Sequence, residues 1–274
     1  MFEKIPQNQI KFQVLTYAAV KAKKNEIIKF LLNHGCPPNV GIQDAIRNFL
    51  NRNKERPSLL TYSFHSDDIE LFNMLMDKGM SIDMENACNL RAMRNLSSDN
   101  FKTVISKIGN LSNISIITIM DYLKTDQIIL MIESGARINE TVIHSDNTED
   151  SILSFAISNN NVRLAKYLLQ KGASVNIRCR EHMFIKAFGT NDFELIKMIG
   201  DKFKNININI SEQESLILSA IESNNIKLFV YLIQNFEFNQ KVIEITIEKS
   251  ISKTKNSEIF ELLFSKLENV NFRT

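Results

Sequence analysis

The chain has 274 residues, of which 44% are hydrophobic and 23% charged, and this ordinary globular composition excludes a disordered polymer and a collagen-like fibre. Its 33 basic and 31 acidic residues leave a formal net charge of +2, which is too balanced to indicate nucleic acid or an acidic membrane as a partner. The three cysteines, Cys36, Cys88 and Cys179, form no C-x-x-C pair, so neither a disulfide framework nor a structural zinc site is expected.

The N-terminal segment, residues 1–10, contains Phe2, Ile5 and Ile10 and is expected to cap the fold that follows. It lacks the apolar run of about 7–15 residues that a secretory signal needs, and no later stretch approaches about 18 uninterrupted apolar residues. An odd number of scattered cysteines suits a reducing compartment. These features favour an intracellular, cytoplasmic chain without a membrane span.

A similar sequence pattern then recurs along the chain, which predicts an amphipathic helix that ends at a glycine. Four of the eight glycines close it, namely Gly35, Gly79, Gly135 and Gly172. The apolar residues before each of them follow the i, i+3, i+4 spacing of one helix face, and glycine can adopt the left-handed conformation that ends a helix. An Asn or Asp four residues later, as in Asn139, can bond to the backbone of a turn.

The clearest internal match relates residues 156–170 to residues 220–234. Ala156 and Ala220 stand 64 residues apart, or about two units of 32, and the unit expected between them is present as Ala187 followed by residues 192–199. Each unit also begins with a shorter helix that carries a small residue at its middle, followed by an Asn- or Asp-rich turn that can cap the second helix. We therefore predict a repeat unit that consists of a helix, a tight turn, a longer helix that ends at a glycine, and a polar loop that leads to the next unit.

These residues resemble the ankyrin repeat, whose period is 33 and whose signature opens T-P-L-H-x-A and closes with leucines, Gly and Asn. Residues 151–156 (SILSFA) and 215–220 (SLILSA) are similar to the opening, with Ser for Thr and without the Pro and His, and residues 168–176 (LLQKGASVN) keep the close. The resemblance implies a single all-α solenoid over 1–274, with about eight helix pairs, short hairpin-like loops and an inserted helix at 42–53. The expected repeat units are 11–40, 42–83, 87–113, 114–139, 151–176, 182–207, 215–240 and 243–274.

The sequence contains no phosphate-binding glycine loop, nucleophile elbow or HExxH pair, so we expect no enzyme activity, no cofactor and no metal. The resemblance implies instead a monomeric, non-catalytic scaffold that binds another protein through the concave face of first helices and through the loop tips. In such a stack, the acidic loop that contains Asp146 would lie beside the basic loop that contains Arg178. The residues expected to contact the partner are Asp146, Asn147, Glu149, Arg178, Arg180, Glu181 and His182.

Two other functions stay open. Degenerate, Asn- and Lys-rich ankyrin arrays resemble those of intracellular pathogens, large viruses and protists, which favours a host-directed effector or the recognition arm of a ubiquitin-ligase adaptor. The third reading is a thiol-dependent hydrolase or transferase that uses Cys179 with His182 or a site within residues 84–140.

Overall fold

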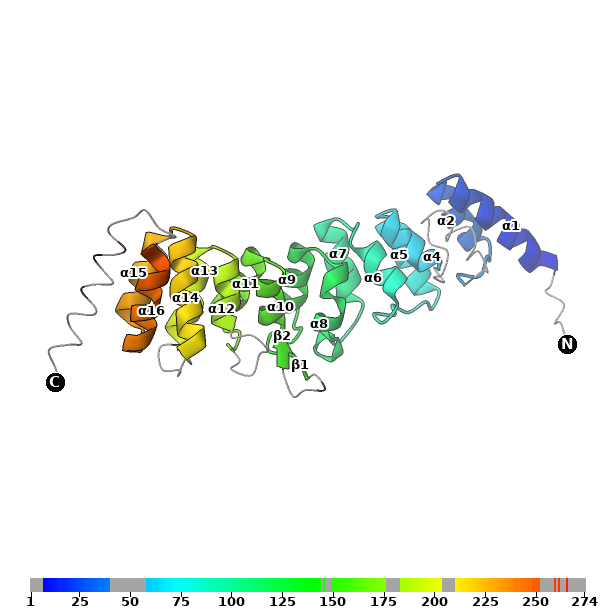
Figure 1. The fold of residues 1–274 in the computed structure, drawn as a ribbon. Helices are drawn as coiled ribbons and strands as arrows, with labels where there is room; N and C mark the ends of the chain where they lie inside the picture. Colours follow the sequence, from blue (N-terminus) through cyan, green and yellow to red (C-terminus); the bar gives the residue numbers. More distant parts are fainter. Residues whose placement is uncertain are drawn as a thin grey trace. The chain divides into compact units, whose positions relative to one another are not determined.

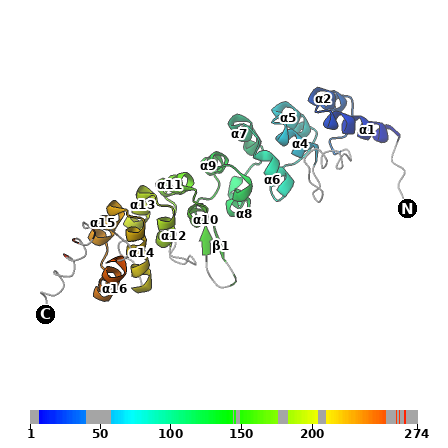
Figure 2. The ribbon, with the colours of Figure 1, turned by 45° about the horizontal axis from the view of Figure 1, so that its top comes forward.

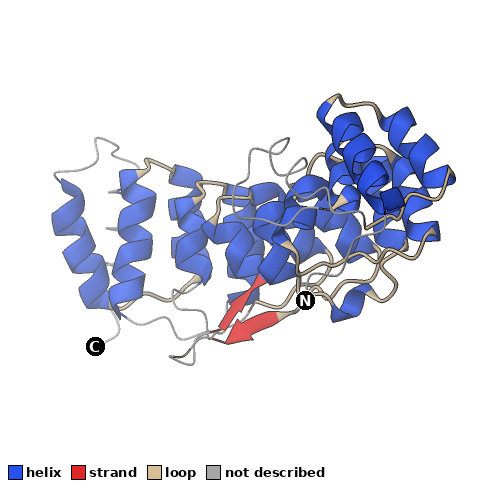
Figure 3. Cartoon of the chain, turned by 90° about the vertical axis from the view of Figure 1, so that its right-hand side faces the viewer, coloured by secondary structure: helices blue, strands red, loops and turns tan. Residues whose placement is uncertain are grey.

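The computed structural model describes residues 7–39, 58–143, 145, 149–175, 183–203, 210–251, 259, 261 and 265. These residues form two compact units, an N-terminal unit (Met1–Arg137) and a C-terminal unit (Ile138–Thr274). The described part is built almost entirely of α-helices (Figures 1 and 3), which confirms the predicted all-α fold class. The helix predicted at 42–53 lies outside the described residues.

The N-terminal unit consists of helix pairs, each with a first and a second helix joined by a tight turn. First helices pack on first helices, as α4 does on α6, and second helices pack on second helices, as α7 does on α9. The pairs are α1 (Gln7–Lys21) with α2 (Asn25–Asn33), α4 (Leu59–His65) with α5 (Ile69–Asp77), α6 (Ala87–Met93) with α7 (Ser98–Ser106), and α8 (Ile116–Ile119) with α9 (Thr125–Glu133). Two 3-10 turns, η1 (Leu111–Asn113) and η2 (Met120–Tyr122), precede and follow α8.

The C-terminal unit opens with an antiparallel hairpin of β1 (Thr141–Ile143) and β2 (Glu149–Ser151), in which Val142 is opposite Asp150. Its helices then follow one another side by side in chain order (Figures 1 and 2). They are α10 (Ile152–Ser158), α11 (Val162–Gln170), α12 (Met183–Gly189), α13 (Phe193–Phe203), α14 (Ile210–Glu222), α15 (Ile226–Asn235) and α16 (Gln240–Ile251).

The start of α10 shows why the SILSFA segment opens a helix. The hydroxyl of Ser151 accepts a hydrogen bond from the Ser154 N–H, and the hydroxyl of Ser154 accepts one from the Ser151 N–H. This reciprocal capping box satisfies two of the backbone donors that a helix start leaves without partners. Ser58 and Thr61 form the same arrangement at the start of α4, so the two openings are equivalent.

In the pairs α1–α2, α4–α5 and α10–α11 both helices end in the same backbone motif. After α11, the Ala173 N–H donates to the carbonyl of Leu168 and the Gly172 N–H to that of Leu169, which is the Schellman arrangement. The motif needs a residue with positive φ, supplied by glycine after second helices and mostly by Asn or Asp after first helices. These residues are Gly35, Gly79, Gly109, Gly135 and Gly172 in the first group, and Lys23, Asp67, Asn160, Asn191 and Asn224 in the second. The predicted glycine stops and polar turns are thus confirmed.

The core lies between helices of neighbouring pairs. In α11 the buried residues are Leu164, Ala165, Leu168 and Leu169, which share one helix face. The small residues predicted at the middle of first helices are buried as well, because they let neighbouring first helices approach closely. They are Ser63, Ala156, Ala187 and Ala220 and, of the two alternatives Ala18 and Ala19 in the first unit, Ala19, whereas Ala18 is exposed.

Candidate functional site: a hollow over the first helices of the N-terminal unit

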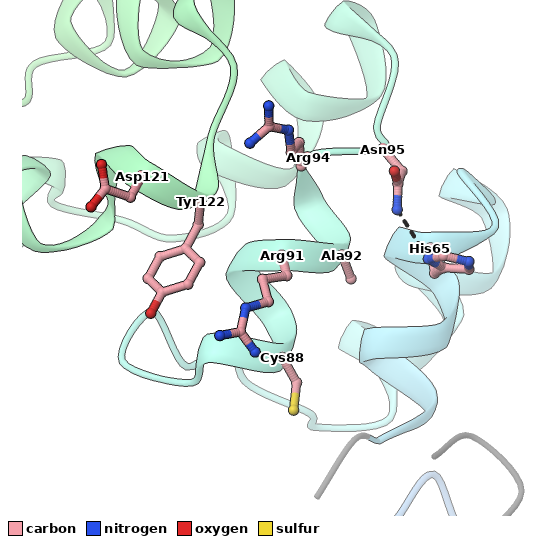
Figure 4. A pocket seen from close by; sticks show the side chains of 8 residues that line it. All are labelled: His65, Cys88, Arg91, Ala92, Arg94, Asn95, Asp121 and Tyr122. Carbon is pink, nitrogen blue, oxygen red and sulfur yellow. Dashed lines mark hydrogen bonds between the residues drawn. The ribbon is translucent and has the colours of Figure 1, made fainter. Parts of the chain in front are cut away.

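A hollow of about 490 Å³ lies over the first helices of three consecutive pairs in the N-terminal unit (Figure 4). Side chains from α4, from α6 and the residues just after it, and from η2 surround it. Its lining consists of His65, Cys88, Arg91, Ala92, Arg94, Asn95, Asp121 and Tyr122.

Helix geometry places the residues of α6 on the hollow. Cys88, Arg91 and Ala92 are spaced i, i+3 and i+4, so they share one face of the helix. Cys88 and Ala92 are buried, whereas Arg91 is half-buried. The helix therefore presents an apolar floor with one guanidinium rising from it.

Two polar contacts order the walls of the hollow. The guanidinium carbon of Arg91 lies 5.2 Å from the centre of the Tyr122 ring, within the range of a cation–π interaction. On the opposite side Asn95 Nδ2 lies 3.0 Å from His65 Nδ1 (Figure 4), which links the end of α6 to the end of α4. Each contact joins residues of different helix pairs.

The rim of the hollow carries two charged side chains, Arg94 and Asp121. Arg94 and Asp121 are exposed, and the described residues provide no hydrogen bond or ion pair to either side chain. An arginine of this kind can donate a forked pair of hydrogen bonds to a carboxylate or a carbonyl group. The arrangement of aromatic ring, guanidinium groups and amide is suited to recognising side chains of another molecule.

The cysteines within the described residues are not set up as nucleophiles. Cys36 and Cys88 are both buried, and neither forms a disulfide bond within the described residues. Burial raises the pKa of the Cys36 thiol, and the Thr16 hydrogen bond only partly offsets that effect, so the thiol stays protonated near neutral pH. No group of three or more His, Cys, Asp or Glu side chains that could hold a metal ion occurs within the part of the chain that the structure describes.

A family model described as ankyrin repeat matches residues 149–180, a span that includes β2, α10 and α11. The turn with positive φ found in this span recurs in helix pairs of both units, and the glycine stop recurs in helix pairs of the N-terminal unit. Residues 149–180 of the chain thus form an ankyrin repeat.

A relative of this chain occurs in a poxvirus. The two sequences are 26% identical over 166 residues, and the relative is an ankyrin repeat protein of Fowlpox virus (strain NVSL). The matched region covers 60% of this chain and 22% of the fowlpox protein, so the chain spans about a fifth of the length of that relative. Among the described helices, none has the length and apolarity needed to cross a membrane.

The loop-tip residues predicted to contact the partner fall mostly outside the described residues. Glu149 is placed, half-buried in β2 and opposite Ile143 of β1. The others, Asp146, Asn147, Arg178, Arg180, Glu181 and His182, lie outside the described residues, as does Cys179. Their gathering at one edge of this ankyrin-repeat protein stays a prediction.

The hollow itself was not predicted from the sequence. The repeats that supply Arg91 and Tyr122 keep helical periodicity but little of the ankyrin signature, so their first helices are hard to align. One signal is present in the sequence, since Arg91 is the one charged residue of α6 and follows its N-cap, Asn86, by five residues. A guanidinium at that place in a first helix marks a face that is not closed by core packing.

Proposed function

We propose that this ankyrin-repeat protein is a non-catalytic scaffold that binds a partner protein through the first-helix hollow of the N-terminal unit. Ankyrin repeats generally mediate protein–protein interaction. The observation that carries the proposal is the hollow of about 490 Å³, in which Arg91 is stacked on Tyr122 and Arg94 has no partner among the described residues. Arginine and tyrosine are among the residues that most often dominate binding energy at interfaces.

The chemistry of the hollow specifies the kind of contact. A partner side chain that enters it meets the Tyr122 ring and the apolar floor of α6, while a carboxylate or carbonyl next to it can accept hydrogen bonds from Arg94. Stacking on Tyr122 restrains Arg91 before the partner arrives, so less side-chain entropy is lost on binding. The hollow thus favours an aromatic or aliphatic side chain that is flanked by an acidic residue.

A host-directed role is supported by the fowlpox relative. In this role the hollow and the loop tips, with Glu149, Arg178 and Arg180, would recognise a host protein, and an adaptor function would deliver that protein to other machinery. Family membership also supports a role without catalysis, because ankyrin repeats are typically non-enzymatic scaffolds.

The test is affinity capture with the full chain as bait, in which proteins retained by the wild type are identified and quantified by mass spectrometry. The variant Arg91→Glu/Arg94→Glu reverses the charge of the hollow. Its matched control, Lys102→Glu/Lys107→Glu, makes the same change of charge on the exposed side of α7 in the same unit. Proteins captured by the wild type and the control but lost from the first variant support the proposal, whereas equal capture by all three proteins contradicts it.

The loop tips are tested in the same experiment with Arg178→Glu/Arg180→Glu. Loss of the same proteins from this variant supports a contact that includes the loops. Unchanged capture removes the loop tips from the proposal and leaves the hollow.

A further inference from the structure

A lysine clamp joins successive second helices in the N-terminal unit. Lys29 of α2 is buried, and its Nζ lies 3.4 Å from Asp68 Oδ2 and 2.5 Å from Glu70 Oε2. Counted from the N-cap of each helix, the lysine is the fifth residue of α2, Asp68 is the N-cap of α5, and Glu70 is the second residue of α5. The cation of one helix therefore binds the first turn of the next.

The same clamp recurs in the C-terminal unit between α11 and α13. Lys166 is the fifth residue after the N-cap of α11, and its Nζ lies 2.9 Å from Asp192 Oδ1 and 2.6 Å from Glu194 Oε2. Asp192 also accepts a hydrogen bond from the Leu195 N–H, as an N-cap does. Two interfaces in different units thus use one arrangement of lysine, N-cap aspartate and glutamate.

The next interface, between α13 and α15, keeps the lysine and loses both acids. Lys197 occupies the fifth position of α13, but the N-cap of α15 is Asn225 and the second residue is Lys227. One lysine with two carboxylates is replaced by two lysines with a neutral amide. Both lysines are exposed, and neither ammonium group has an acidic partner among the described residues.

These two lysines line one groove of about 640 Å³ with an apolar wall. Phe193 of α13 and Ile226 and Val230 of α15 are half-buried along it. The groove therefore presents apolar surface beside two uncompensated positive charges. Its remaining lining residues are Asp201, Tyr231, Gln234 and Asn235.

The one acidic residue of the groove is already engaged. Tyr231 donates a hydrogen bond from its hydroxyl to Asp201 Oδ1, at 2.8 Å. The tyrosine is held there because Gly200 leaves room for it: a Cβ at Gly200 would lie 2.7 Å from the Tyr231 hydroxyl oxygen. Asp201 is thus directed to Tyr231, while Lys197 and Lys227 stay open to a ligand.

We propose that the groove between α13 and α15 is a second binding site, which takes an acidic segment of a partner protein. A carboxylate of that segment would lie between Lys197 and Lys227, replacing the aspartate and glutamate that complete the clamp at the other two interfaces. An apolar side chain next to it would cover Phe193, Ile226 and Val230. The site is formed by second helices of the C-terminal unit, so it is distinct from the first-helix hollow.

The test uses a fluorescein-labelled synthetic peptide of ten residues in which glutamate and leucine alternate, with a second peptide that carries glutamine for each glutamate. Fluorescence anisotropy measures binding of both to the full chain at low ionic strength. We expect the acidic peptide to bind at least about tenfold more tightly than its neutral counterpart, because ion pairs with two lysines add to the same apolar contact. Equal affinity for the two peptides would overturn the proposal.

Three variants locate the binding. Lys197→Gln/Lys227→Gln is expected to remove the tenfold preference, while the control Lys102→Gln/Lys107→Gln, with the same loss of charge in the other unit, is expected to keep it. If both variants lose it equally, net charge and not the groove is responsible, and the proposal is wrong. The hollow also favours an apolar side chain next to an acidic one, so the variant Arg91→Glu/Arg94→Glu separates the two sites. It is expected to keep a preference for the acidic peptide, because the groove is unchanged. Loss of the preference in this variant, with the preference kept in Lys197→Gln/Lys227→Gln, would assign the peptide to the hollow and overturn the proposal.

A complementary variant completes the clamp. In Asn225→Asp/Lys227→Glu the two missing acids are supplied to Lys197, and the N-cap is retained because Asp caps as well as Asn. We expect this variant to lose the preference for the acidic peptide while its thermal unfolding midpoint stays equal to or above that of the wild type. A fully folded variant that still prefers the acidic peptide would contradict the assignment of Lys227 to the site.

Discussion

Replacing Lys29 with alanine removes the cation that joins α2 to α5 in the N-terminal unit. Its pairs with Glu26 and Glu70 are partly solvated, since those side chains are 86% and 72% exposed, and each is worth about 0.2–1 kcal/mol. Asp68 is only 13% exposed, so removal of the Lys29 ammonium group leaves a nearly buried carboxylate without its cation. Removing one partner of a fully buried pair costs about 3–5 kcal/mol.

The cost at Asp68 is smaller than that limit because other donors remain. Its Oδ2 accepts a hydrogen bond from Asn25, and its Oδ1 accepts one from the Leu71 N–H. We therefore expect Lys29→Ala to lower the free energy of unfolding by about 2–3 kcal/mol. The matched change Lys166→Ala should cost about 0.5–1 kcal/mol, because Asp192 is 30% exposed and Glu194 68% exposed.

The assay is urea unfolding followed by circular dichroism, combined with hydrogen exchange to locate the change. Because repeat proteins are stabilised by nearest-neighbour interfaces, exchange should accelerate in α2 and α5 in the first variant and in α11 and α13 in the second. Equal costs for the two variants would refute the reasoning from exposure. Burial by itself would lower the pKa of Lys29, but hydrogen bonds to Glu70 and Glu26 and the charge of Asp68 raise it, so this contribution persists at neutral pH and is lost only above the ordinary lysine pKa of about 10.4.

Three further predictions concern the C-terminal unit. Gly172→Ala should cost about 1 kcal/mol in urea unfolding because φ is +87°, whereas Gly189→Ala, in open space at a helix end, should be neutral; equal costs would contradict the left-handed assignment. Gly200→Ala should cost about 1–3 kcal/mol, since its Cβ would displace the Tyr231 hydroxyl, and unchanged tyrosine absorbance and stability would argue against that contact. Asp192→Asn should lower the melting temperature at pH 7 and have no effect near pH 2. A difference in melting temperature between variant and wild type that is the same at both pH values would contradict this prediction.

The sign of the Asp192 effect follows from its surroundings. Burial would raise the pKa of this carboxyl, but the hydrogen bond from the Leu195 N–H and the charge and hydrogen bond of Lys166 lower it. A group with a lowered pKa in the folded state stabilises the protein above its unfolded pKa of about 3.9 and loses that contribution as the pH falls through the folded value. Asn keeps the cap, so the substitution removes only the charge.

The features that the sequence revealed are those that depend on local chemistry. Asn160 and Asn224 could be assigned to turns because an Asn tolerates positive φ wherever it stands, and Gly172 could be assigned to a helix end for the same reason. The glycine after α7, Gly109, has the same geometry but was not singled out, because its helix carries a weaker apolar pattern before it.

The sites needed information that the sequence alone does not display. His65, Arg91 and Tyr122 come from α4, α6 and η2, so the hollow exists only once these three elements are packed together. The groove between α13 and α15 leaves a signal in the sequence, because Lys197 and Lys227 differ from the other two lysine clamps once the N-caps of the second helices are aligned. That alignment requires knowing which residue begins each helix.

Site-specific photo-crosslinking tests the proposed mode of binding most directly. A benzoylphenylalanine replaces Tyr122 in the hollow, and in a second protein it replaces Lys107 at the end of α7. Binding through the first helices predicts that a captured partner forms a crosslink at position 122 and none at position 107. A partner that is captured by both proteins and crosslinks only at position 107 would show that the first-helix hollow is not its binding site.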